Sequence, residues 1–192
     1  MTLRRLLAAL LALAATLALA LPAAAVDEGD DDLLVSREKP QELADRLIDF
    51  EIKDQHDREH TDAELRDRVA VLMWIDRQAG QWRDAWHAAL KTALQPQLDA
   101  GTADVRIVAH VKGAPFFIKG RIKGAFRDDV SDWVLMDWKG RFEQAYGPTA
   151  DHVNVMVFAA DGALAAAWTG QQLDEAVTGE VAAKVAELTA AP

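Results

Sequence analysis

Two histidines in the first half of the chain have a spacing that some enzymes use to bind zinc. Residues 56–60, HDREH, match the H-x-x-E-H pattern of one class of zinc peptidases. On a helix, histidines four residues apart share one face and can bind Zn²⁺ together, while the glutamate acts as a base. Here the pattern falls in a polar turn, and no acidic helix downstream offers a third ligand. We therefore interpret it as a solvated hairpin turn.

A wider set of histidines could bind copper or zinc together with carboxylates. Isolated histidines, however, are more often surface residues or hydrogen-bonded core residues. The sequence therefore predicts no metal site and no cofactor. The five histidines are His56, His60, His87, His110 and His152.

Other catalytic chemistries are limited by residue types that the chain lacks. It contains no cysteine, which excludes dithiol exchange, thiol-based peroxide reduction and thiolate metal binding. Ser36 and Ser131 lie outside a G-x-S-x-G motif, and the glycines lack the spacing of a phosphate-binding loop. The sequence therefore predicts no catalytic residue.

The charge balance restricts the expected partners. The 192-residue chain has a formal net charge of −10, so it repels phosphate backbones and anionic lipid headgroups. We expect no nucleic-acid partner and no peripheral membrane binding. One stretch, residues 112–127, is basic and aromatic instead. We expect its phenylalanines, Ile118 and Ile122 to cover a sheet while its lysines face water; if functional, the stretch would pair with an acidic surface.

Hydrophobic periodicity gives the elements that would position these residues. The apolar run over 69–75 predicts a strand buried on both faces. Apolar residues at every fourth position predict a helix over 79–95 that ends at Pro96. These residues are Trp82, Trp86, Leu90 and Leu94. Further strands are expected over 49–54, 104–111, 133–138, 153–158 and 163–169, and further helices over 140–147 and 173–188.

The order of these elements predicts an α/β fold. Strands and helices alternate in the first half, which indicates parallel strands. Asp161 and Gly162 predict a tight turn between the last two strands, which would then be antiparallel.

The N-terminus has the features of a secretory signal peptide. Arg4 and Arg5 precede an apolar stretch over 6–21, which is shorter than the roughly 20 residues needed to span a bilayer. Small residues then predict cleavage between Ala25 and Val26. We expect an acidic flexible leader over 26–38, a domain over 39–192, and a periplasmic or secreted protein with no stable membrane anchor after cleavage.

Four segments resemble the thioredoxin-like superfamily in its redoxin form. They are DFEIKDQHDREHT, RVAVLMWIDRQAGQW, VLMDWKGRFEQAYG and VNVMVFAADGALAAAWTG. With the signal peptide, the chain is most similar to the small periplasmic YtfJ-type proteins, over roughly residues 40–190. The resemblance implies a thioredoxin-like fold, with a central mixed β-sheet flanked by helices and an N-terminal β-hairpin.

The resemblance also places a degenerate redox site in this chain. Ala79 and Trp82 occupy the positions of the two catalytic cysteines, with Gly80 and Gln81 between them. Val153 stands where the family has a cis-proline. Because a cis bond before another residue costs roughly 3–4 kcal/mol, we expect a trans bond there.

Two classes of function follow. The first is a redox-inactive binding or accessory module for an unknown protein or peptide partner, which uses the former redox face. The second is a redoxin-family oxidoreductase or a histidine and carboxylate metal handler that works without thiols. An exposed tryptophan at this face would anchor a partner, whereas burial in the core is the usual role of such side chains. The candidate partner-binding residues are Trp74, Asp76, Arg77, Gln78, Trp82 and His152.

Overall fold

The computed structural model describes residues 43–126 and 132–190. The predicted signal peptide, its cleavage site and the acidic leader lie outside these ranges. No helix within them has the length and apolar character needed to cross a membrane.

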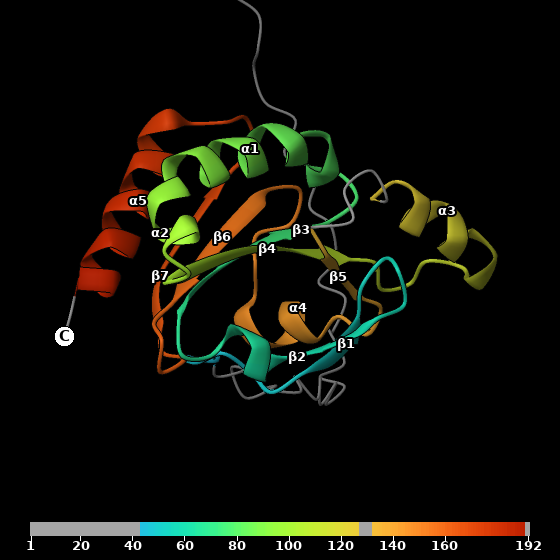
Figure 1. Cartoon of the computed structure of the whole chain (residues 1–192). Helices are drawn as coiled ribbons and strands as arrows, with labels where there is room; N and C mark the ends of the chain where they lie inside the picture. Colours follow the sequence, from blue (N-terminus) through green and yellow to red (C-terminus); the bar gives the residue numbers. More distant parts are fainter. Residues whose placement is uncertain (1–42, 127–131, 191–192) are drawn as a thin grey trace, which may run out of the picture. The chain divides into compact units, whose positions relative to one another are not determined.

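A mixed five-stranded sheet forms the centre of the domain, in the order β5-β4-β3-β6-β7 (Figure 1). Strand β3 (Val69–Ile75) is buried along its whole length. It pairs in parallel with β4 (Ala103–His110) and antiparallel with β6 (Val153–Phe158). Strand β5 (Val134–Asp137) adds in parallel to β4, and β7 (Leu164–Gly170) adds antiparallel to β6. This topology confirms the predicted mixed sheet.

Helices α1 (Arg83–Ala93) and α5 (Glu175–Ala190) cover one face of the sheet (Figure 1). Trp86 of α1 and Val181 and Val185 of α5 have no exposed surface. Removing such side chains from water supplies the main free-energy gain of folding.

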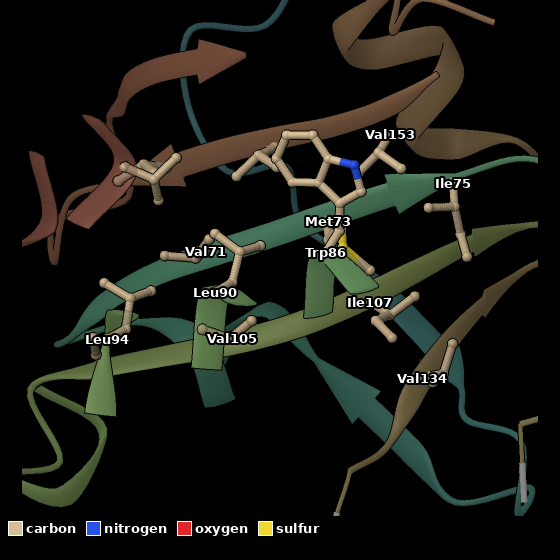
Figure 2. Packing of buried hydrophobic residues seen from close by; sticks show 14 of the residues in the cluster. Val71, Met73, Ile75, Trp86, Leu90, Leu94, Val105, Ile107, Val134 and Val153 are labelled. Carbon is tan, nitrogen blue, oxygen red and sulfur yellow. The ribbon is translucent and has the colours of Figure 1, made fainter. Parts of the chain in front are cut away.

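Trp86 is the largest fully buried side chain of this layer. Figure 2 shows its indole beside Val153 in the core cluster. The indole Nε1 donates a hydrogen bond to the carbonyl of Gln171 at 3.0 Å. A Cβ added at Gly170 would lie 3.0 Å from the indole ring, so any larger residue would require the buried ring to shift by a few tenths of an ångström.

The opposite face carries α4 (Arg141–Tyr146) and an N-terminal hairpin of β1 (Glu51–Lys53) and β2 (Glu59–Thr61). A 3₁₀ turn, η1 (Asp62–Leu65), follows the hairpin. The predicted hairpin is therefore present. Four aromatic rings pack together on this face: Phe50, Phe142, Tyr146 and Phe158.

The helix predicted over 79–95 is divided into three pieces. A 3₁₀ turn, η2 (Ala79–Gln81), precedes α1, and a separate helix α2 (Gln95–Asp99) follows it. Pro96 lies in the first turn of α2 instead of ending the earlier helix, because the first turn needs no N–H from that residue. The other predicted helices and strands begin and end within two residues of their observed limits.

Between β4 and β5 the chain forms a 3₁₀ turn, η3 (Phe116–Ile118), and a short helix α3 (Lys119–Gly124). Phe116 and Phe117 are 83% and 75% exposed, so the expectation that they cover the sheet is wrong. They lie in the tight turn before α3, while the side chains that do pack on the core come from later in the segment, at Ile122 and Phe126.

The Tyr146 hydroxyl joins α4 to the segment before the hairpin. It donates to the carbonyl of Arg46 at 2.9 Å and accepts from the backbone N–H of Ile48 at 2.8 Å. Burial raises the pKa of Tyr146 to about 12, because the phenolate cannot be solvated there.

An alkaline titration tests this environment directly, because Tyr146 is the single tyrosine of the chain. We expect tyrosinate absorbance to appear near pH 12 in the folded protein and near pH 10.0 in urea. Since the folded pKa is raised, this group stabilises the fold below pH 10.0, and its contribution is lost as the pH rises toward 12. Circular dichroism shows whether the sample is folded, and Tyr146→Phe gives the baseline. A folded-state midpoint near 10 contradicts the burial.

Candidate functional site

The loop after β3 is held by one carboxylate. Asp76 Oδ1 accepts hydrogen bonds from the backbone N–H groups of Gln78 at 2.9 Å and Ala79 at 2.8 Å. Its Oδ2 accepts from the backbone N–H of Asp151 at 2.7 Å. Asp76 therefore starts the turn that leads into α1 and ties it to the loop before β6.

The loop before β6 is held from the other side by Asn154, which is 6% exposed. Asn154 Oδ1 accepts from the backbone N–H of Thr149 at 2.8 Å. Its Nδ2 donates to the carbonyls of Thr149 at 2.9 Å and His152 at 3.0 Å. No peptide bond among the described residues is cis, so the bond before Val153 is trans. Asp151 adopts a left-handed φ of 60° in this loop.

The four residues that the resemblance assigns to the redox positions have different environments. Ala79 has no exposed surface, and Trp82 is half-buried against the core. Gly80 is half-buried and Gln81 is exposed. Val153, at the position compared with the cis-proline, is fully buried beside Trp86. The structure therefore brings the loop after β3 and the loop before β6 together, and neither loop carries a thiol.

Most of the candidate partner-binding residues lie around the Asp76 turn. Arg77 and Gln78 are exposed, whereas Asp76, Trp82 and His152 are half-buried. The His152 ring is oriented by a hydrogen bond between its Nδ1 and the carbonyl of Ala150 at 2.8 Å. We call the exposed and half-buried side chains here the loop surface. It consists of Arg77, Gln78, Gln81, Trp82 and His152.

Trp74 does not belong to the loop surface, which corrects its assignment as a partner-binding residue. It is 3% exposed, because the alternation of β3 turns its side chain toward the α4 side of the sheet. Its ring lies 5.2 Å from that of His110, centroid to centroid.

Sequence reasoning missed Asn154 and Asp151. The available signal was a polar residue inside an otherwise apolar strand, since Asn154 interrupts the run VNVMVF. A buried amide in such a strand must satisfy its own hydrogen bonds. In this fold it does so by fixing the neighbouring loop.

The HDREH segment spans the hairpin turn and the start of β2, as predicted, but His60 is only 7% exposed, so the expectation of a solvated segment is wrong for this residue. His60 Nδ1 lies 2.9 Å from Glu64 Oε2, and His60 Nε2 lies 3.1 Å from Asp54 Oδ2. The ring also stacks on Trp133 at 4.0 Å between centroids. Both ring nitrogens are therefore engaged by carboxylates. Among the residues that the structure describes, no group of three histidine or carboxylate side chains could hold a metal ion.

Asp54 is the buried centre of this hairpin network. Its carboxylate has no exposed surface and accepts hydrogen bonds from the backbone N–H groups of His56 and Arg58 and from the Arg58 side chain. Burial alone raises the pKa of Asp54, but the hydrogen bonds from His60, Arg58 and His56 outweigh it. The pKa is therefore lowered below the ordinary value of 3.8.

Comparison with known proteins identifies the fold. No protein-family model matches the chain, and no curated protein sequence matches it. Solved structures do match, at low identity. A protein assigned as thiol:disulfide interchange protein DsbE from Chlorobium tepidum aligns with a TM-score of 0.57 and 14% identity, over 77% of this chain and 98% of that one.

Two further solved structures also match the fold of this chain. The pneumococcal exposed lipoprotein thioredoxin from Streptococcus pneumoniae aligns with a TM-score of 0.52 and 17% identity, over 71% of this chain and 99% of that one. Peroxiredoxin Q from Xanthomonas campestris aligns with a TM-score of 0.52 and 13% identity, over 73% of this chain and 92% of that one. The chain therefore has a thioredoxin-like fold, as the resemblance implied, and it lacks the cysteines of thiol redox chemistry.

Replacing Asp76 tests whether its carboxylate fixes the loop surface. We expect Asp76→Ala to lower the free energy of unfolding by about 1–3 kcal/mol, because three backbone N–H groups lose their acceptor. Urea denaturation measures this loss. Arg77→Ala, an exposed change in the same loop, is the control and should stay within about 0.5 kcal/mol of wild type. Equal stability of the two variants would contradict the assigned role of Asp76.

A second substitution tests the hairpin network. Asp54→Asn should lower the free energy of unfolding by about 3 kcal/mol at neutral pH. The reason is that the groups that donate hydrogen bonds to the Asp54 carboxylate would lose their charged acceptor. The lowered pKa makes this contribution present above pH 3.8 and lost as the pH falls through the folded value. The difference from wild type should therefore shrink in acid. Asp49→Asn, at a carboxylate that is 93% exposed, is the matched control and should have little effect.

Proposed function

We propose that this chain is an exported, redox-inactive thioredoxin-fold protein that acts as a binding or accessory module for a protein or peptide partner. The observation that carries the proposal is the double attachment of Asp76 to the turn before α1 and to the loop before β6. This attachment holds the loop surface in one arrangement before any partner arrives. Pre-organisation of this kind reduces the entropy that binding costs.

The chemistry of the loop surface suits recognition better than catalysis. Arg77, Gln78 and Gln81 offer a guanidinium and two amides to solvent. The position of the first family cysteine holds the buried methyl group of Ala79. Half-buried Trp82 adds apolar area at the same edge.

Recognition by this surface would use side chains more than backbone pairing. In a redox-active relative, the cis-proline loop offers its backbone to an extended substrate. Here the carbonyls of Thr149 and His152 already accept from Asn154, and the backbone N–H of Asp151 donates to Asp76. A partner that formed hydrogen bonds with these backbone groups would first have to displace internal ones. The net free energy gained on binding would therefore be small.

Export to the periplasm or the cell exterior is part of the proposal. It is supported by the basic start, apolar stretch and small residues of the N-terminus. One structural neighbour is itself described as an exposed lipoprotein thioredoxin.

Affinity capture with the mature chain, residues 26–192, tests the proposed binding. The bait is immobilised and incubated with periplasmic extract, and retained proteins are quantified by mass spectrometry. We expect a retained partner to be lost with the combined variant Arg77→Ala, Gln78→Ala, Gln81→Ala. The control Lys184→Ala, Glu187→Ala on α5 should retain it, because that ion pair lies outside the loop surface. A partner retained equally by both variants would contradict the proposal.

The alternative functions predict other results. A metal handler should copurify with copper or zinc and lose the metal in His56→Ala, His60→Ala. A redoxin-family oxidoreductase should reduce insulin or peroxide above background. Either result would replace the binding proposal.

A further inference from the structure

A cavity on the side of the domain that carries the hairpin is unusually basic for an acidic chain. Its volume is about 320 Å³, and residues from β1, the hairpin turn, α3, β5 and the start of α4 line it. Five cations are among them: Lys53, Lys119, Lys123, Lys139 and Arg141.

Two of these cations are already neutralised by the hairpin. Lys53 Nζ lies 3.4 Å from Glu59 Oε1, and Lys123 forms an ion pair with Asp57. The ion pair between Lys123 and Asp57 joins α3 to the β1–β2 turn, and both of these elements line the cavity.

The other three cations have no carboxylate within ion-pair distance among the described residues. Lys119 Nζ lies over the Trp138 ring, 4.7 Å from its centroid, and this contact leaves its charge unpaired. Lys139 is exposed and Arg141 is half-buried. Three cations around one concavity, none of them paired with a carboxylate of the described residues, create a positive potential that attracts an anion.

The two remaining carboxylates that line the cavity reduce this potential without abolishing it. Asp137 is 1% exposed and uses both oxygens to accept the backbone N–H groups of Arg141 and Phe142 at 3.0 Å each, at the start of α4. Glu51 is exposed and contributes a single negative charge. With Asp137 and Glu51 counted against Lys119, Lys139 and Arg141, the lining keeps an excess of one positive charge.

An exposed aromatic pair stands directly before this cationic helix in the chain. Phe116 and Phe117 pack edge to face at 6.0 Å between centroids, and they are the most exposed large apolar side chains of the described residues. The sequence from residue 105 to residue 127 contains no acidic residue, although the whole chain carries a net charge of −10. Large exposed aromatics beside unpaired cations are typical of interaction sites.

We propose that the cavity and the Phe116–Phe117 pair together bind an acidic segment of a partner protein in which carboxylates alternate with apolar side chains. The carboxylates neutralise Lys119, Lys139 and Arg141, and an apolar side chain covers the phenylalanine pair. This inference goes beyond the proposed function because it uses none of the residues of the loop surface.

The shape of the site favours a polypeptide over a lipid bilayer. A flat bilayer could receive the exposed phenylalanines, but Lys139 and Arg141 line a concavity that a flat surface does not enter. The net charge of the chain also opposes an anionic membrane. A flexible acidic segment can enter the cavity and cover the aromatic pair at the same time.

Fluorescence anisotropy with a defined probe tests the proposal. The probe is a labelled synthetic peptide of alternating Glu and Leu, titrated with the mature chain at low and high salt. We expect saturable binding that weakens with salt. A peptide of alternating Lys and Leu should not bind.

Matched variants locate the binding. The combined change Lys119→Gln, Lys139→Gln, Arg141→Gln should raise the dissociation constant of the acidic peptide by about tenfold or more, since three charge contacts are lost. Phe116→Ser, Phe117→Ser should also weaken it. Arg77→Gln should bind as wild type does, because it lies on the loop surface. Thermal melting establishes that each variant is folded.

Three results would overturn the inference. They are no saturable binding of the acidic peptide, equal binding by the charge variant, and binding to phosphatidylglycerol vesicles without binding to the peptide. Loss of peptide binding in Arg77→Gln alone would assign the peptide to the loop surface instead. A failed affinity capture would not affect this test, because the loop surface shares no residue with the cavity and the Phe116–Phe117 pair.

Discussion

The carboxylate of Asp76 holds together the loop after β3 and the loop before β6. It accepts three backbone N–H groups from two loops that are more than seventy positions apart in the chain. Because all three bonds end on one short, half-buried side chain, the two loops are fixed at little cost in side-chain entropy. Asn154 completes the arrangement from the sheet side. The side chains that surround this carboxylate are mostly polar, and none of them is a thiol.

This arrangement depends on the burial of β3. Every residue of the strand is buried, with Val71 and Met73 in the layer under α1 and α5 and Leu72 and Trp74 in the layer under α4. A strand packed on both faces cannot shift its register without moving its apolar side chains out of both cores. The turn that Asp76 begins therefore starts from an anchored point.

The order and type of most helices and strands can be predicted from the sequence, whereas the contacts of the candidate site mostly cannot. Strong periodicity over 69–75 and 153–158 located the central strands, because a strand buried on both faces must be apolar throughout. Exposure could not be predicted in the same way: Trp74 faces the core while Phe116 faces water, and their residue types alone suggest similar burial. The bonds of Asp76 to Asp151 and of Asn154 to Thr149 depend on tertiary contacts, which periodicity does not contain.

Native-state amide hydrogen exchange measures directly whether Asp76 fixes the loop surface. The backbone N–H groups of Gln78, Ala79 and Asp151 donate to this carboxylate, although Gln78 and Asp151 are exposed residues. We expect these three amides to exchange slowly compared with the amide of Arg77 in the same loop. Exchange of all of them at the rate of an unstructured chain would contradict it.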